Sequence, residues 1–211
     1  QNCLIGFSRA SDTKPYGKLI ASVVRRIIGA RIFDIETWGV KMRLDPNRNV
    51  AEKRVLFAPS RFDIKEREYL AAHLKTGDIF IDIGANIGGY SMWAAKCAGQ
   101  HGKVLALEPQ PKVLVRLCAN ARFNPELPII ILPIAAGETK SKMQMSISAS
   151  NDGEGSLART SQSGGFIEVE VMPLVDILAS QDIDRIDGLK IDVEGFEESV
   201  LLPFFANAPK T

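Results

Sequence analysis

Two groups of acidic side chains stand where this sequence can do chemistry. Glu108 ends the apolar run 103–107 and lies 24 positions after Gly84, which follows another apolar run at 79–83. An acidic residue roughly 20 positions after a glycine turn can accept the ribose hydroxyls of a nucleotide. Asp192 and Glu194 end a further strand pattern that starts at Leu189. A carboxylate there can bind an acceptor hydroxyl or remove its proton.

These assignments have structural alternatives. Asp192 can instead fix the cofactor side of a cleft, and Glu194 can cap the helix that follows it. Asp82 lies inside an otherwise apolar strand, so burying it requires backbone N–H groups or an ammonium group as partner. It is either part of the cofactor site or a structural brace for the turn.

The turn after residues 79–83 differs from the dinucleotide-binding pattern G-x-G-x-x-G. Asn86 stands where the second glycine would let a pyrophosphate approach. Asparagine can still adopt a positive φ, so the tight turn is retained. The pattern therefore favours a nucleotide-like ligand without a pyrophosphate and disfavours an NAD-dependent oxidoreductase.

Alternating strands and helices position these residues. The spacing predicts a doubly wound α/β domain with a parallel sheet, right-handed crossovers and helices on both faces. Residues 143–148 and 166–172 predict a hairpin over the sheet edge, and the Ser/Gly-rich segment 151–165 is either a lid or a plain connector. The predicted strands are 79–83, 103–108, 129–136 and 189–193, and the predicted helices are 90–98, 111–123, 173–180 and 194–205.

An N-terminal helix and β appendage is predicted for residues 1–60, followed by the α/β domain at 61–211. Residues 16–28 have the spacing of an amphipathic helix with a basic side, which can dock on the protein's own core, lie on a membrane or contact a partner helix. Residues 38–44 alternate like a strand. Residues 63–74 predict a helix with Asp63 as its N-cap.

Composition excludes several classes of protein. The 26 Lys and Arg residues balance 25 Asp and Glu residues, so no global field attracts nucleic acid or an acidic membrane, and no apolar run has the length of a transmembrane segment. Three cysteines without a close pair argue against a disulfide framework and predict a reducing, cytoplasmic location. Two histidines, His73 and His101, make a metal site unexpected.

The block from Asp82 to Ser91, with Glu108-Pro109, Asn120 and Leu189 to Gly195, resembles the FkbM family of S-adenosylmethionine-dependent methyltransferases. The resemblance implies a Rossmann-like fold with S-adenosylmethionine as cofactor. It implies that Glu108 holds the ribose hydroxyls and that the methyl acceptor is a hydroxyl of a small molecule or saccharide. By this resemblance Gly84, Ala85, Asn86 and Gly88 line the methionine and ribose part of the cofactor, and Ala135 and Ala136 lie near the adenine.

The wider superfamily continues past the fourth core strand and its helix into three more strands. This sequence ends at Thr211, soon after that helix. Either the sheet is truncated or another chain covers its edge, as in a homo-oligomer. A catalytically impaired, adenosine-binding scaffold protein is therefore a second hypothesis beside the methyltransferase.

Overall fold

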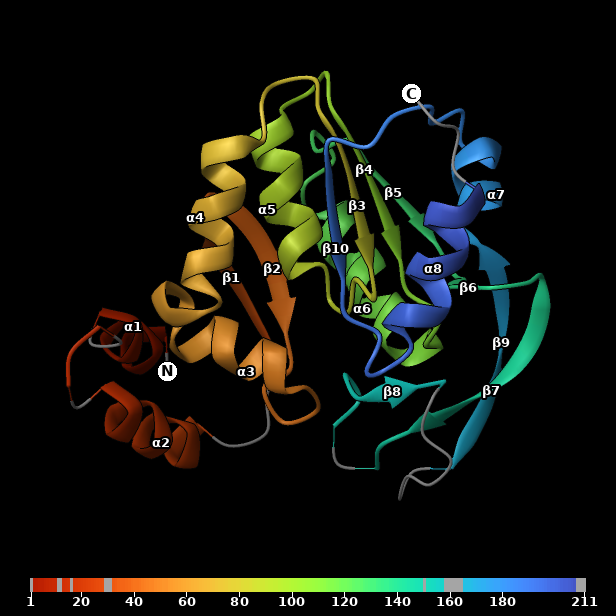
Figure 1. Cartoon of the computed structure of the whole chain (residues 1–211). Helices are drawn as coiled ribbons and strands as arrows, with labels where there is room; N and C mark the ends of the chain where they lie inside the picture. The colour runs from red at the N-terminus through yellow and green to blue at the C-terminus, as the bar shows by residue number, and fades with distance from the viewer. Residues whose placement is uncertain are drawn as a thin grey trace.

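The computed structural model describes most of the chain, and Figure 1 shows the arrangement of its elements. The described residues are 2–10, 13–15, 17–28, 32–149, 151–157 and 165–207.

A four-stranded parallel sheet forms the centre of the α/β region, in the order β10-β3-β4-β5. It confirms the predicted α/β fold. The strands are short and apolar because helices cover both of their faces. Their bounds are β3 Ile79–Ile83, β4 Lys103–Leu107, β5 Ile129–Leu132 and β10 Gly188–Ile191.

Alternate side chains of each strand enter different hydrophobic clusters. Ile81 and Leu105 pack with α7 and α8 on one face, whereas Phe80 and Val104 pack with α5 on the other. In Figure 1, α4 and α5 lie on one side of the sheet and α7 and α8 on the opposite side. These helices are α4 Ile64–His73, α5 Gly89–Ala98, α6 Pro111–Arg122, α7 Leu174–Ser180 and α8 Glu197–Asn207.

A second sheet stands beside the parallel one, in the order β6-β9-β7-β8. Its antiparallel pair of β7 and β9 confirms the predicted hairpin. The prediction of one strand over 129–136 is wrong, because the chain changes sheets at Pro133, which has no N–H to donate to a ladder. The strands are β6 Ala135–Gly137, β7 Ser141–Ile147, β8 Gly155–Ser156 and β9 Phe166–Pro173.

The N-terminal part contains more regular structure than its sequence pattern predicts. The predicted helix and strand are present as α2 and β2, whereas α1, β1 and α3 are additional to the prediction, although residues 33–37 alternate like a strand. In α3 the apolar residues Val55, Leu56 and Phe57 are contiguous, which does not indicate a helix. The elements are α1 Asn2–Ala10, α2 Gly17–Ile28, β1 Phe33–Thr37, β2 Val40–Leu44, α3 Val50–Phe57 and the 3₁₀ helix η1 Pro59–Arg61.

Two asparagines, Asn120 in α6 and Asn124 just after that helix, join the N-terminal hairpin to the α/β region. Asn124 accepts from the backbone N–H of Lys41 and donates to the same residue's carbonyl, both at 2.8 Å, and Asn120 accepts from the N–H of Arg43. Because these side chains satisfy the free edge of β2, that edge needs no further strand. Buried residues on both sides of residue 60, including Met42 and Leu117, belong to one hydrophobic cluster.

Asp63 immediately precedes α4, but it does not cap that helix with its side chain. It has a left-handed backbone (φ 40°), and its carboxylate bonds to Arg54 at 2.5 Å and to the Tyr90 hydroxyl at 3.2 Å. The prediction that the side chain of Asp63 caps this helix is therefore wrong. Asp63 instead links α3 to α5.

Candidate functional site

The carboxyl ends of β3, β4 and β10 meet at one cavity, as expected for an open parallel sheet. Gly84, Glu108 and Asp192 line it from these three strand ends. The cavity holds about 650 Å³ of empty space, part of it open to solvent. A concave site at the carboxyl ends of parallel strands is where open α/β sheets bind small-molecule ligands.

The turn after β3 is built around Gly84 and Asn86. Gly84 has φ 75°, and a Cβ there would lie 2.1 Å from the carbonyl oxygen of Asp192. Only glycine therefore allows the turn to approach the end of β10. Asn86 has φ 53°, and its side-chain oxygen accepts from the N–H of Ile87 at 2.9 Å.

The carboxylate of Glu108 is held at the cavity by two backbone hydrogen bonds. One carboxylate oxygen accepts from the backbone N–H of Asn86 and the other from that of Gln110, both at 2.9 Å. Burial raises the pKa of Glu108 to about 7, although the two backbone bonds and the charge of Lys190 act in the opposite direction. Because a carboxylate has about four acceptor positions, two remain for ligand hydroxyls.

Asp82 does not line the cavity, which favours its alternative role as a structural brace for the turn, and its contact with a cofactor stays a prediction. Its side chain is fully buried, accepts from the Ser91 hydroxyl at 2.6 Å and lies 3.3 Å from Nζ of Lys190. Lys190 also donates to the carbonyl of Gly84 at 2.6 Å. Asp82 thus orients the lysine that braces the turn, which is the alternative role for this residue.

Ala85 and Gly88 also lie outside the cavity lining, contrary to expectation. Ala85 is buried in the hydrophobic cluster beneath the turn. Gly88 has φ 88°, and a Cβ there would lie 2.6 Å from Leu117. These two residues shape the turn by packing against the core.

Apolar residues form the wall of the cavity beside Glu108. Ala135 and Ala136 lie there as expected, at the start of the second sheet. Their small side chains leave room for a flat ring, and Val113 and Ile134 extend the apolar surface. The wall therefore places an apolar surface next to the Glu108 carboxylate.

Asp192 and Glu194 both line the cavity, as expected. Asp192 is exposed, and Glu194 has a left-handed backbone (φ 54°) with its carbonyl accepting from the Ser156 hydroxyl at 2.8 Å. The last helix begins at Glu197, three residues after Glu194, and the carboxylate of Glu197 accepts the N–H groups of Val193 and Gly195.

The described part of the Ser/Gly-rich segment, residues 151–157, forms a strap that lines the cavity. The backbone N–H of Asp152 donates to the carbonyl of Arg48 at 2.7 Å, and Asn151 accepts from the N–H of Val50. Arg116 bridges Asp152 and the buried Glu52 at 2.5 and 2.8 Å. The strap is therefore held by the N-terminal part of the chain, which favours the lid alternative for 151–157, while residues 158–164 lie outside the described ranges.

Several contributors to the site carry no motif in the sequence. Asn49 accepts from the N–H of Ala51 as the N-cap of α3 and donates to the side-chain oxygen of Asn86 at 2.7 Å. Gln110 and Phe196 line the cavity from the segments after β4 and β10. A polar residue before a helix is a signal for Asn49, but its contact with Asn86 depends on tertiary structure.

The described ranges contain neither a cluster of metal ligands nor a membrane-spanning helix. Within them, no three His, Cys, Asp or Glu side chains gather closely enough to hold a metal ion, and the expected lack of a metal site stays a prediction. None of the helices described has the length and apolar character needed to cross a bilayer. Cys97 and Cys118 are free thiols, while the side chain of Cys3 lies outside the described residues. The cytoplasmic location likewise stays a prediction.

Comparison with known proteins matches this site region to one family. The family model described as Methyltransferase FkbM domain matches residues 82–209. A 31-O-demethyl-FK506 methyltransferase FkbM from Streptomyces tacrolimicus is 29% identical over 185 residues, covering 72% of this chain and 69% of that relative. Methyltransferase sdnD from Sordaria araneosa is 29% identical over 166 residues, covering 63% of this chain and 62% of the relative.

Solved structures and shorter matches are more distant. The crystal structure of P. horikoshii TYW2 in complex with MeSAdo is 23% identical, with a TM-score of 0.40 over 58% of this chain and 49% of that one, a likeness too low to support any argument about function. A tRNA U34 carboxymethyltransferase from Ectopseudomonas mendocina is 37% identical over 76 residues, covering 36% of this chain and 23% of that relative. The expectation that the chain binds no nucleic acid therefore stays a prediction.

Proposed function

This chain belongs to the FkbM methyltransferase family, as its motifs predict, and on that premise we propose that its cavity binds S-adenosylmethionine for methylation of a hydroxyl on a small-molecule or saccharide acceptor. The observation that carries the proposal is the position of Glu108. Its carboxylate lies at the cavity between the glycine turn and an apolar wall, with acceptor capacity to spare.

The residues present fit the cofactor. Glu108 would accept the ribose hydroxyls, and Ala135 and Ala136 would contact the adenine. Gly84 and Asn86 would lie along the ribose and methionine part, where the fixed turn presents backbone groups rather than bulky side chains. When bound, S-adenosylmethionine supplies an electrophilic methyl group on a sulfonium.

Asp192 and Glu194 are the proposed catalytic residues. An acceptor hydroxyl loses its proton as its oxygen gains the methyl group, and a carboxylate at the cavity can accept that proton. Both residues belong to the short segment after β10, and both line the cavity. Holding the acceptor oxygen in line with the transferred group contributes further through positioning.

The cofactor assignment is tested by calorimetric titration of the chain with S-adenosylmethionine, S-adenosylhomocysteine and NAD. The proposal expects the two adenosyl ligands to bind and NAD not to bind. Binding of NAD alone, or of no ligand by a chain shown to be folded, contradicts it. The last outcome leaves a scaffold protein as the better hypothesis.

The acceptor and the catalytic residues need a second experiment. Mass spectrometry can detect methyl transfer to a panel of polyols, sugars and short RNA. We expect products with hydroxylated small molecules, and Asp192→Asn or Glu194→Gln should lower kcat while the affinity for S-adenosylhomocysteine is unchanged. Loss of that affinity in either variant would move the residue to the cofactor side, and products with RNA alone would contradict the acceptor class.

A further inference from the structure

The helix α2, which lies outside the cavity, exposes both apolar and cationic side chains to solvent. The inner side of α2 docks on the protein's own core, because Val24 is buried and Ile20 and Ala21 pack against the same cluster. The outer side of α2 is exposed to solvent. Leu19, Val23 and Ile27 are 68%, 50% and 60% exposed. Their spacing of four residues places them in one stripe along a helix about 18 Å long.

A cationic groove lies beside this stripe, between α2 and α3. Lys18 of α2 lines it with Lys53 and Arg54 of α3 and with Arg61, while Phe57 forms part of its apolar floor. No acidic side chain lines the groove among the described residues.

Two of the four cations are already engaged within the fold. Arg54 pairs with Asp63, and Arg61 donates to the carbonyl of Lys14. In the described part of the chain, neither the side chain of Lys18 nor that of Lys53 forms an ion pair or hydrogen bond. These two lysines are therefore available for an external anion.

The balanced net charge of the whole chain hides a strong local excess. Residues 1–31 contain six Lys or Arg residues and one acid, Asp12, whereas residues 32–211 contain 20 basic and 24 acidic residues. The positive charge is thus concentrated in the segment that includes α2. Figure 1 places α2 at the outer edge of the molecule, beside α3 and away from the parallel sheet.

We propose that α2 and the adjoining groove dock on an anionic phospholipid bilayer. Leu19, Val23 and Ile27 would enter the boundary between headgroups and acyl chains, and Lys18 and Lys53 would bind lipid phosphates. A helix that combines an apolar stripe with a basic polar side has the features of a surface-lying membrane helix. Anionic lipid attracts each such cation at short range.

Other occupants fit these observations less well. A second copy of the chain would bring the same positive segment against itself. Nucleic acid would satisfy the lysines but would leave three large apolar side chains in water. Free phosphate would occupy the groove without using the stripe. Only an anionic bilayer matches both the charge and the apolar side chains.

The test is flotation of the full chain with vesicles of phosphatidylcholine alone and with one third phosphatidylserine. We expect binding to the anionic vesicles only, weakened by added salt. Lys18→Glu with Lys53→Glu should reduce partitioning on the order of 25-fold or more, since each lysine near the surface contributes on the order of fivefold. The double substitution Leu19→Ser with Val23→Ser should also reduce partitioning onto the anionic vesicles.

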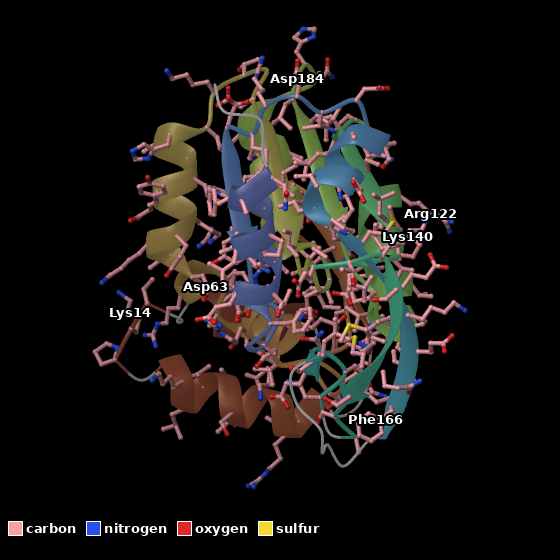
Figure 2. The ribbon with its side chains drawn as sticks, turned by 45° about the vertical axis from the view of Figure 1, so that its right-hand side comes forward. Lys14, Asp63, Arg122, Lys140, Phe166 and Asp184 are labelled. Atoms are coloured by element: carbon pink, nitrogen blue, oxygen red, sulfur yellow. The ribbon has the colours of Figure 1, made fainter. Side chains whose placement is uncertain are left out.

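Matched controls lie elsewhere on the molecule. Lys140→Glu reverses a charge on an exposed loop, on the side opposite to Lys14 in Figure 2, and Leu202→Ser removes an apolar side chain that is 67% exposed on α8. Both should leave partitioning unchanged. Circular dichroism establishes that each variant is folded.

Several results would overturn the proposal. These are a lack of vesicle binding, equal losses in the controls, saturation of the groove by inorganic phosphate that abolishes flotation, and tighter binding to a short RNA than to vesicles. Lipid-independent dimerisation that Leu19→Ser abolishes would likewise replace the bilayer with a second copy. None of these results depends on cofactor binding.

Discussion

The backbone N–H of Asn86 donates to a carboxylate oxygen of Glu108 across 2.9 Å, which joins the turn after β3 to the end of β4. The other oxygen of Glu108 accepts from Gln110. One buried acid therefore fixes both segments that meet at the cavity. Its expected role toward ribose depends on the acceptor positions that remain.

Replacing Glu108 should weaken cofactor binding. Glu108→Ala removes hydrogen bonds to a charged acceptor, so we expect the affinity for S-adenosylhomocysteine to fall by about 1.5 to 3 kcal/mol, roughly 10- to 150-fold. Calorimetry measures this change, and the exposed Glu138→Ala is the control. An unchanged dissociation constant in folded Glu108→Ala would remove the ribose assignment.

Gly84 should tolerate no side chain. In Gly84→Ala the new Cβ would meet the carbonyl of Asp192 at 2.1 Å, and the residue would also keep a positive φ. Gly77 is the matched control because its φ is 94° and a Cβ added there would have nothing within 4 Å. We expect Gly77→Ala to cost on the order of 1 to 2 kcal/mol of unfolding free energy from φ alone.

Gly84→Ala should cost more than Gly77→Ala, and only Gly84→Ala should lower the affinity for S-adenosylhomocysteine. Urea unfolding and calorimetry measure the two quantities. Equal destabilisation by both substitutions would mean that the contact with Asp192 relaxes freely, and the turn would not then depend on the close approach.

Asn49 should act through two separable bonds. Its side chain caps α3 through Ala51 and also donates to Asn86 at 2.7 Å. Asn49→Ala removes both bonds and should cost about 1 kcal/mol of stability as a lost cap. Asn49→Asp keeps an acceptor for the cap but loses the donor.

The comparison of these variants assigns a positioning role to Asn49. Asn49→Asp should retain most of the stability while its affinity for S-adenosylhomocysteine falls as far as that of Asn49→Ala. If Asn49→Asp binds like the unaltered chain, Asn49 serves the helix alone.

The sequence predicts the parts of the fold that local pattern determines. The four parallel strands follow from short apolar runs, and Gly84 and Glu108 follow from their spacing. The change of sheet at Pro133 is missed because Ile134 and Ala135 continue the apolar run. The role of Asp82 stays open in the sequence because a buried carboxylate near a turn can serve a ligand or a lysine, and only the tertiary position of Lys190 favours the second role.

The contacts of the strap could not be predicted from the sequence pattern either. Residues 151–157 bond to Arg48, Val50 and Arg116, which lie far away in the sequence. Contacts of this kind have no periodic signal. The sequence therefore predicts the composition of the segment but leaves its role as lid or connector open.

Stability should fall as pH rises toward neutrality. Burial raises the pKa of both Glu52 and Glu108 to about 7 from an ordinary value of 4.5. Between these values the folded chain binds more protons than the unfolded chain, so the free energy of unfolding decreases with rising pH. The acids with lowered pKa, including Asp187 and Glu197, act below this window.

Glu52→Gln isolates one of the two titrations. Glu52 is fully buried beside Arg116. In Glu52→Gln the free energy of unfolding should therefore decrease less between about pH 5 and pH 8, by up to about 2 to 3 kcal/mol. Urea unfolding across this range measures the slope, with the exposed Glu138→Gln as control. The slope is the informative quantity, because loss of a charge partner for Arg116 can shift stability at every pH. A slope that Glu52→Gln leaves unchanged would show that Glu52 is ionised throughout the range, with Arg116 outweighing the effect of burial.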